Sequence, residues 1–277
     1  MEKIAVIILT KNNFKLFKNC LDSFVKNNTY TNLKFYIGDT GSSKQTIKNI
    51  SNYIKAYNYA AELISFKRYN FAKNNNWIVK NRVKEDLVLF CNDDIKIEND
   101  CLPDMVKLLT NQVATVGCKL LYPNNTIQHL GHLHCGVLLD DGNYIIGAHH
   151  LHLNEPDRDF DATTFVHGNT FAFCLVNKNT YLKYRGLDED YEVCFEDVNF
   201  CLTCMENGLK HLCVSNKFNY HIESATRNTG IHMDPRDTER IVFRLTEFYN
   251  KITLNEKFTK FKQDVLSFVP PVSVINY

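Results

Sequence analysis

The stretch Leu87–Ile95, LVLFCNDDI, decides the fold because it joins an apolar run, typical of a buried strand, to two acidic residues. The five apolar residues Leu87–Cys91 are typical of a strand that is buried on both faces. Asn92, Asp93 and Asp94 follow directly, so an amide and two adjacent carboxylates stand at the end of this strand. A strand of this kind belongs in a parallel sheet covered by helices, and its polar end belongs at the sheet edge where ligands bind.

The chain before this stretch repeats the same unit. Runs rich in β-branched and aromatic residues alternate with segments whose apolar residues recur at helical spacing. Such alternation predicts an α/β fold with a mostly parallel central sheet and helices on both faces. The expected strands are Lys3–Thr10, Leu33–Asp39, Ala61–Phe66 and Asp86–Asp94, and the expected helices are Lys11–Asn28, Lys44–Asn58 and Asn70–Val83.

The pattern changes in the second half. Asp100 is expected to cap a helix with Pro103 in its first turn. The segment Asn124–Asp161 is rich in Gly, His and Asp and predicts a hairpin and a long loop over one face, a smaller acceptor region. The other expected elements are strands at Val113–Pro123 and Thr163–Lys178, a helix at Phe195–Lys210, short strands at His211–Asn216 and Lys217–Ser224, and a helix at Asp237–Ile252.

We therefore expect one domain over residues 1–250, with a nucleotide-binding half at 1–115, an acceptor and catalytic half at 116–230, and a tail at 251–277. The 277 residues carry a net charge of +1, which gives no reason to expect nucleic acid as a partner. The apolar run near the start of the chain is too short for a secretory leader. No apolar run in the sequence approaches the ~20 residues that a membrane span needs. A cytoplasmic protein is expected.

The ten cysteines are expected to be reduced, because most lie inside apolar runs and cytosolic disulfides are rare. Cys201 and Cys204 form a single Cys-x-x-Cys pair inside a helical pattern. Core packing is the preferred interpretation, and a redox or zinc pair is the alternative.

Polar residues end three of the early strands: Thr10, Asp39 and the pair Asp93–Asp94. The ends of parallel strands share one edge, so these residues should converge. Each acid could instead cap the following helix. The adjacent pair would repel, however, and a bound cation resolves the repulsion. Carboxylates suit Mg²⁺ or Mn²⁺, which usually share their shell with substrate phosphates.

Two further groups of candidate site residues lie in the second half of the chain. Glu196–Asp197 at a helix start could supply a general base, or could be ordinary helix N-terminal charge. His221 could complete a metal shell, or could be a core or surface residue. The six histidines of the middle segment do not match a zinc-finger spacing, so acceptor contact or plain loop polarity is favoured over zinc. These are His129, His132, His134, His149, His150 and His152.

Together these blocks resemble the inverting family 2 glycosyltransferases with the GT-A fold, over about Ile4–Arg227, and bacterial cell-envelope, rhamnosyltransferase-like members above all. YIGDTGSSKQT resembles the family's Asp-x-Gly-Ser turn, and NFAKNNNWIV its Phe-Ala-x-x-x-Asn segment. LVLFCNDDI resembles its Asp-x-Asp metal motif, although it reads Asn-Asp-Asp. The opening strand and helix and the later blocks VGCKLLYPNNTIQHLG, GLDEDYEVCFEDVNFCLTCMENGLK and YHIESATR follow in the same order.

The resemblance implies roles for single positions on the donor side. Thr10 lies where the first strand meets the base, and Asp39 matches the acid that hydrogen-bonds it. Asn75 or Asn76 matches an amide of the nucleoside pocket. Asp93 should face the ribose or donor sugar.

The resemblance also implies the catalytic side. Asp94 matches the metal-binding acid, and His221 the residue that joins the metal or the pyrophosphate. Asp197 matches the catalytic base, with Glu196 beside it. The remaining pair, Gly168 and Asn169, matches the segment beside the sugar and the acceptor.

The function expected is metal-dependent inverting transfer of a sugar from a nucleoside-diphosphate donor to a glycan or other acceptor, with Mn²⁺ or Mg²⁺. Asp39 favours a uracil or thymine base, since either presents an N–H to a carboxylate, so a UDP-sugar is favoured and a dTDP-sugar is second. A nucleotidyltransferase is one alternative, but TKNNFKLF after the first strand lacks the glycines of a triphosphate loop. A non-catalytic nucleotide-sugar binding module is the other.

Overall fold

The first half of the chain forms the parallel strands that the alternation predicts. The computed structural model describes residues 2–56, 60–138, 144–222, 234–254 and 273–274. Four strands pair in parallel in the spatial order β4-β1-β2-β3. The elements are β1 (Ile4–Thr10), α1 (Phe14–Asn27), β2 (Leu33–Asp39), α2 (Lys44–Ala56), β3 (Ala61–Ser65), α3 (Phe71–Asn81) and β4 (Leu87–Asn92).

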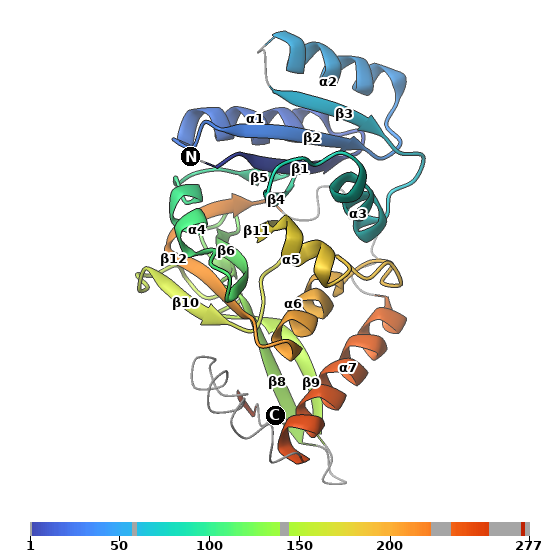
Figure 1. The fold of residues 1–277 in the computed structure, drawn as a ribbon. Coiled ribbons are helices and arrows are strands. Elements are labelled where there is room, and N and C mark those ends of the chain that lie inside the picture. Colours follow the sequence, from blue (N-terminus) through green and yellow to red (C-terminus); the bar gives the residue numbers. More distant parts are fainter. Residues whose placement is uncertain (1, 57–59, 139–143, 223–233, 255–272, 275–277) are drawn as a thin grey trace.

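The second half extends this sheet to ten strands in the order β10-β12-β6-β11-β4-β1-β2-β3, with β5 paired to β12 and β7 to β6 (Figure 1). The strand β11 lies antiparallel between β4 and β6, whereas β12 is parallel to β6. The elements are β5 (Ile95–Lys96), α4 (Leu102–Leu108), β6 (Val113–Leu121), β7 (Ile127–His129), β10 (Thr163–Val166), β11 (Phe173–Asn177), α5 (Lys178–Lys183), α6 (Glu196–Glu206) and β12 (Lys210–His221).

A smaller sheet projects from one end of the molecule, with α7 (Pro235–Leu254) alongside it (Figure 1). It consists of β8 (His132–Leu138), β9 (Tyr144–His150) and β13 (Ser273–Val274), and β8 and β9 form an antiparallel hairpin. Ile146 of β9 packs with Ile241 and Leu245 of α7. The hairpin predicted between Asn124 and Asp161 is therefore confirmed.

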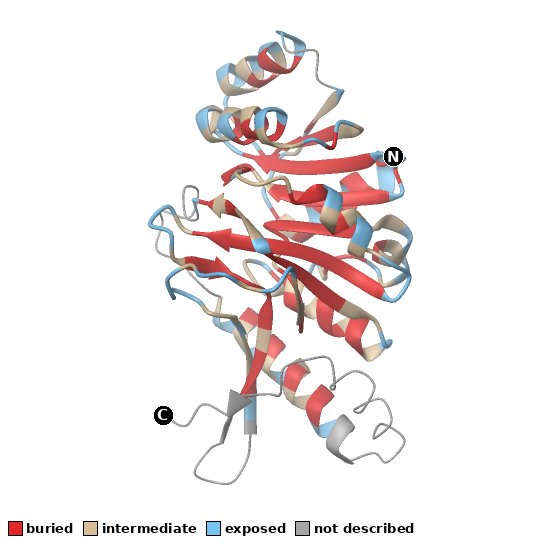
Figure 2. Ribbon diagram, turned by 90° about the vertical axis from the view of Figure 1, so that its left-hand side faces the viewer, coloured by how far each residue is buried: buried red, intermediate tan, exposed pale blue. Residues whose placement is uncertain are grey.

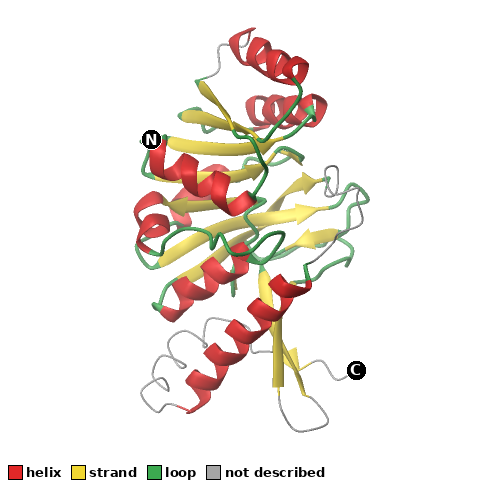
Figure 3. Cartoon of the chain, turned by 90° about the vertical axis from the view of Figure 1, so that its right-hand side faces the viewer, coloured by secondary structure: helices red, strands yellow, loops and turns green. Residues whose placement is uncertain are grey.

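The two faces of the large sheet carry separate hydrophobic cores, with helices on both sides (Figure 3). Alternate residues of β1 point to opposite faces. Ile4, Val6 and Ile8 pack with α1, α2 and α4, whereas Ala5 and Ile7 pack with α3, α5 and α6. Figure 2 shows the central strands as buried along most of their length. Each fully buried aliphatic side chain contributes about 1.5–3 kcal/mol, so burial on both faces holds β1 and its end rigidly in place. The predicted α/β class is confirmed.

Three local predictions are wrong. The strand predicted at Thr163–Lys178 is two strands, since β10 pairs with β12 whereas β11 lies between β4 and β6. Asp100 does not cap the following helix: the N-cap position is Cys101, without a side-chain hydrogen bond, and Asp100 accepts a hydrogen bond from Thr29 instead. The two short strands predicted after Lys210 are one continuous strand, β12, whose register shifts between Val214 and Phe218. The turn-forming residues Ser215 and Asn216 lie within β12, at this shift in register.

The cysteines behave as core residues. Nine of the ten are buried, all ten are free thiols, and Cys201 and Cys204 lie within α6 in the core. The preferred interpretation of the Cys-x-x-Cys pair is confirmed. Among the described residues, no helix combines the length and the apolar character needed to cross a membrane. Apart from the end of α7 and residues 273–274, the predicted tail lies outside the described residues, as do residues 223–227 of the YHIESATR block.

Candidate active site

The polar residues that end the parallel strands meet at one edge of the sheet. Thr10 of β1 lies opposite Asp39 of β2, and Leu9 lies opposite Asn92 of β4. The predicted convergence is confirmed. The carboxylate of Asp39 is buried and accepts hydrogen bonds from the peptide N–H groups of the turn after β2. Asp39 thus closes its own turn, and its expected contact with a base stays a prediction.

Strand pairing brings His221 to the acid pair. The short strand β5, which follows Asp94 directly, runs antiparallel to the end of β12, and Ile95 lies opposite His221. As a result Nε2 of His221 lies 3.1 Å from Oδ1 of Asp94. Asp93 and Asp94 are each only 7% exposed. The site therefore combines two buried carboxylates with one imidazole from a strand distant in sequence.

The hydrogen bonds of His221 leave the nitrogen that faces Asp94 available as a ligand. Its Nδ1 donates to Oε1 of Gln128 at 2.8 Å, which leaves Nε2 facing Asp94. The amide nitrogen of Asn92 approaches the same Nε2 at 3.4 Å. An imidazole nitrogen and a carboxylate oxygen at 3.1 Å require a proton or a metal cation between them, and a cation bound to both would meet this requirement. Histidines that bind metals commonly have a hydrogen bond at the other ring nitrogen, as Gln128 makes here, and this bond orients the ring.

Asp93 gives independent support for a cation at this edge. Burial raises the pKa of Asp93 to about 7, against a smaller lowering by the Thr10 hydroxyl, and the charge of Asp94 raises it further. Its Oδ2 is buried and has no hydrogen-bond partner among the described residues. Two acidic side chains with an imidazole form a donor set that suits Mn²⁺ or Mg²⁺. The residues present therefore fit a divalent cation.

The candidate base stands at the start of α6. Phe195, the N-cap residue, has φ of 71°, which is unusual for a residue with a side chain and makes the sharp turn into the helix. Asp197 is half-buried and accepts hydrogen bonds from the N–H groups of Phe171 (3.2 Å) and Val198 (2.8 Å). Burial raises the pKa of Asp197, whereas these two peptide groups lower it, and burial dominates. A raised pKa suits a general base. Glu196 is buried beside it.

Asp237 of α7 braces the loop that leads to this base, a role that no sequence pattern around Asp237 indicates. Its carboxylate is 2% exposed and accepts hydrogen bonds from the peptide N–H groups of Glu192 (3.2 Å), Val193 (2.8 Å) and Cys194 (3.2 Å). These three residues directly precede Phe195. The start of α6 is therefore anchored to α7 through one side chain.

The two candidate amides of α3 differ in their contacts. Asn76 uses both ends of its amide inside the protein, since it donates to Leu187 O (2.8 Å) and Glu189 (3.0 Å) and accepts from Tyr181 (2.6 Å). Within the described part of the chain, the side chain of Asn75 donates only to the carbonyl of Phe71 (2.9 Å). This difference favours Asn75 as the residue that contacts a nucleoside.

The predicted acceptor-side pair is closely packed. The side chain of Asn169 is fully buried and donates to Thr115 and to the carbonyl of Leu212, both at 2.9 Å. Gly168 lies against Cys201, where an added Cβ would approach the cysteine Cβ to 2.7 Å. Both residues shape the peptide segment that reaches Thr170 and Asp197, and their contact with acceptor stays a prediction.

Three histidines of the middle segment converge. Side-chain nitrogens of His129, His132 and His150 lie within 4.8 Å of one another. His129 and His132 are buried. Plain loop polarity is therefore wrong for these three residues. Acceptor contact stays a prediction.

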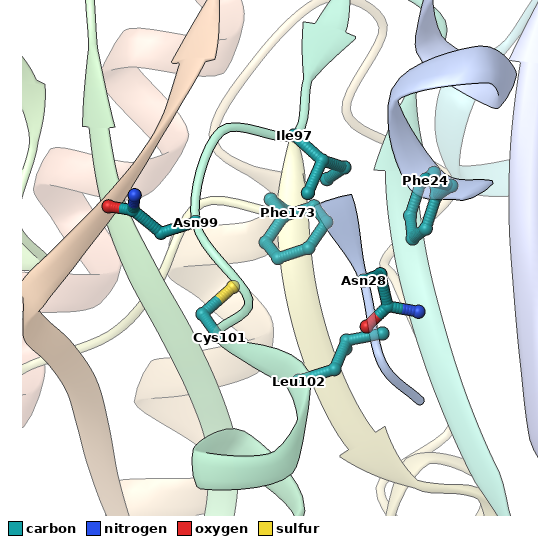
Figure 4. Close-up of a pocket in the computed structure, with 7 residues that line it drawn as sticks. All are labelled: Phe24, Asn28, Ile97, Asn99, Cys101, Leu102 and Phe173. Atoms are coloured by element: carbon teal, nitrogen blue, oxygen red, sulfur yellow. The ribbon is translucent and has the colours of Figure 1, made fainter. Parts of the chain in front are cut away.

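Two hollows lie beside α1 and the segment that follows β4. One is lined by α1, by the segment that begins at Asp94 and by Ile222, which follows β12, and so it reaches Asp94. The other is a small apolar crevice lined by Phe24, Asn28, Ile97, Asn99, Cys101, Leu102 and Phe173 (Figure 4). The second contains no carboxylate, so it is not the candidate cation site.

Comparisons with known proteins identify this architecture. Residues 5–183 match the family model described as Glycosyl transferase family 2. The chain is 25% identical over 236 residues to the O-antigen biosynthesis protein RfbC of Myxococcus xanthus, covering 81% of this chain and 18% of that protein. It is 27% identical over 231 residues to the uncharacterized protein y4gI of Sinorhizobium fredii (strain NBRC 101917 / NGR234), covering 81% and 25%. The chain thus spans about a fifth to a quarter of these relatives.

Solved structures share the fold. GalNAc-T7 with UDP, GalNAc and Mn²⁺ has a TM-score of 0.66 at 11% identity, covering 95% of this chain and 54% of that one. S. aureus TarS 1-349 in complex with UDP-GlcNAc has a TM-score of 0.62 at 17% identity, covering 96% and 71%. The mannosyltransferase PcManGT from Pyrobaculum calidifontis, with GDP-Man and Mn²⁺, has 0.59 at 12%, covering 96% and 68%. At these identities the likeness shows the GT-A fold.

Proposed function

Since the chain belongs to glycosyl transferase family 2, we propose that it transfers a sugar from a nucleoside-diphosphate sugar to a hydroxyl of a glycan or glycoconjugate, with inversion at the anomeric carbon. The observation that carries this proposal is the approach of His221 to the buried pair Asp93–Asp94, 3.1 Å from Asp94, at the edge where Thr10 and Asp39 also end. A cation and a diphosphate suit this combination of charge and burial.

The donor's nucleoside is assigned to the edge formed by β1, β2 and the start of α3. Thr10 and Asp39 would contact the base and Asn75 the nucleoside, while Asp93 would face the ribose or donor sugar. UDP is the preferred nucleotide, because a carboxylate accepts from the ring N–H of uracil. Two of the fold's solved relatives bind UDP or UDP-GlcNAc, which supports this preference, and dTDP is second.

Asp94 and His221 would hold Mn²⁺ or Mg²⁺, with Asp93 close by. Bound there, the ion would offset the negative charge that develops on the diphosphate leaving group. Gln128 keeps Nε2 of His221 directed at Asp94 through its 2.8 Å hydrogen bond to Nδ1. The rigid end of β4 holds both carboxylates in place.

Asp197 would act as the base. Its carboxylate takes the proton of the acceptor hydroxyl while the oxygen forms a bond to the anomeric carbon. The bond from that carbon to the diphosphate oxygen breaks, and its electron pair leaves with the diphosphate. One displacement from the opposite face inverts the configuration. The N–H groups of Phe171 and Val198 orient the carboxylate, and its half-exposed position lets an acceptor reach it.

The test replaces Asp197 by Asn and compares it with Glu206→Gln, which alters an acid at the far end of the same helix. Asp197→Asn should still bind a UDP-sugar with Mn²⁺ in a thermal-shift panel, but transfer should fall by about 10²–10⁴-fold. Glu206→Gln should transfer at the wild-type rate. NMR of the product's anomeric proton reports inversion. Wild-type transfer by Asp197→Asn, or a retained anomeric configuration, would overturn the assignment.

A further inference from the structure

Three imidazoles gather on the acceptor side, beside the proposed base and apart from the acid pair. We propose that His129, His132 and His150 form a second metal site, which binds a transition-metal ion of the Zn²⁺ class. The set contains nitrogen ligands only. Imidazole suits Zn²⁺, Co²⁺, Ni²⁺ and Cu²⁺, whereas the carboxylates of the donor site suit Mg²⁺ and Mn²⁺.

The rings are arranged around a common point. Their centroids lie 5.1 Å (His129–His132), 4.8 Å (His129–His150) and 5.1 Å (His132–His150) apart, and the ring planes are inclined by 79°, 77° and 84°. One nitrogen from each ring lies within 4.8 Å of the others. Zinc–nitrogen bonds of about 2.0–2.1 Å place tetrahedral ligand nitrogens about 3.4 Å apart, so the Nδ1 atoms of His129 and His150, at 2.8 Å, would separate slightly while the more distant pairs approach. Small side-chain rotations would supply this.

The backbone that carries these rings is regular. His132 and His150 are directly opposite each other in the hairpin of β8 and β9. His129 ends β7, where it lies opposite Leu120 of β6. The peptide N–H of His132 donates to the carbonyl of Gly168 at 2.7 Å, which ties the hairpin to the segment before the base. Ligands on paired strands are held in register before any ion binds.

The chemistry of the buried rings favours coordination. His129 and His132 are both buried, and burial favours the neutral imidazole, which keeps a lone pair for coordination. His132 forms no side-chain hydrogen bond with any described residue, and its Nδ1 is buried. A buried imidazole without a partner is costly, since it has one donor and one acceptor to satisfy. A bound ion would satisfy the acceptor.

His129 and His150 form a hydrogen bond between their Nδ1 atoms, at the place where an ion would bind. Their Nδ1 atoms lie 2.8 Å apart, and Nε2 of His129 accepts from the N–H of Thr170 at 3.2 Å. Metal binding at Nδ1 moves the proton of His129 to Nε2. Oδ1 of Asn169, the residue before Thr170, is buried without a hydrogen-bond partner among the described residues and can accept that proton's hydrogen bond. Metal-bound histidines commonly donate to an oxygen in this way.

The location suggests what the open coordination position would take. His129 accepts from the N–H of Thr170, and Asp197 accepts from the N–H of Phe171, the next residue. Three protein ligands leave a fourth position for water or a substrate oxygen. The ion would therefore hold an acceptor oxygen near Asp197. This last role depends on the proposed function, whereas the metal site itself does not.

The test measures Zn²⁺ and Co²⁺ binding to the chelator-stripped 277-residue chain in an Asp94→Asn background, which removes the donor-site ligand. His150→Gln is compared with His149→Gln, the same change at the exposed neighbouring residue of β9. We expect one equivalent of Zn²⁺ in the background protein and in His149→Gln, with the visible absorption of tetrahedral Co²⁺. His150→Gln should bind at least tenfold more weakly and lose that absorption. Circular dichroism checks that each variant is folded.

Equal Zn²⁺ affinity in His150→Gln and His149→Gln would overturn the proposal, as would the absence of binding by the folded background protein. UDP-sugar binding with Mn²⁺ is measured separately, in chain that retains Asp94. Its failure would count against the proposed function and not against the histidine site.

Discussion

Replacing Asp237 should loosen the proposed base without touching the donor site. The carboxylate of Asp237 accepts from three consecutive peptide N–H groups, at Glu192, Val193 and Cys194, just before the turn into α6. Its Oδ2 takes part in all three contacts, and its Oδ1 also accepts from Glu192 at 3.2 Å. Asp237→Ala removes these acceptors, whereas Asp237→Asn keeps one oxygen.

The structure sets the expected size of the effect. Hydrogen bonds to a charged acceptor contribute about 1.5–3 kcal/mol each, but Glu192 is exposed and its two neighbours half-exposed, so water replaces part of each bond. At about 1 kcal/mol for each N–H group, Asp237→Ala should lower the free energy of unfolding by about 3 kcal/mol and Asp237→Asn by about half of that. Misplacing Asp197 by an ångström should lower kcat by up to about 10²-fold.

The assay combines urea unfolding with steady-state transfer, and Asp190→Asn is the control. Asp190 also joins this loop to α7, through Arg240 at 3.0 Å, but its side chain is 76% exposed, so its loss should cost less than about 1 kcal/mol. Asp237→Ala should reduce kcat while the donor KM stays unchanged. The reasoning is refuted if Asp237→Ala matches Asp190→Asn in both unfolding free energy and kcat.

Two further predictions concern stability. Burial lowers the pKa of His211 to about 4, and its neutral ring accepts from Thr115 and donates to the carbonyl of Cys201. Its contribution is therefore complete above the unfolded pKa of about 6.5 and is lost, at up to about 1.4 kcal/mol per pH unit, as the pH falls towards 4. Urea unfolding at pH 7.5 and 5.5 checks this, and His211→Gln should flatten the dependence. An equally steep dependence in that variant would contradict it. Gly131→Ala should cost about 3 kcal/mol, because φ is 100° and the new Cβ would lie 2.1 Å from Val166. Gly147→Ala, whose nearest contact is 3.6 Å, should cost less than half of that, and equal costs in urea unfolding would argue against the steric account.

Local sequence pattern was sufficient to predict the strands and helices of the first half of the molecule and their parallel order. The β-branched runs and the helical spacing between them are properties of single segments, and parallel order follows from their alternation. The meeting of Thr10, Asp39 and Asn92 at one edge could therefore be predicted before any contact was known. The same local reasoning misplaced the cap at Asp100 by one residue and divided β12 into two strands, because neighbouring packing decides such details.

Long-range pairing decided the rest. The sequence by itself determined the sheet, its polar edge and the acid pair, since these depend on residues close together in the chain. The tertiary structure placed His221 against Asp94, through the pairing of β5 with β12, a proximity that only the family resemblance had implied. It also gathered His129 and His150 and brought Asp237 against the loop that precedes α6. Each of these contacts joins segments whose local patterns carry no information about their partner, because the pairing is selected by the packing of the whole sheet and its helices.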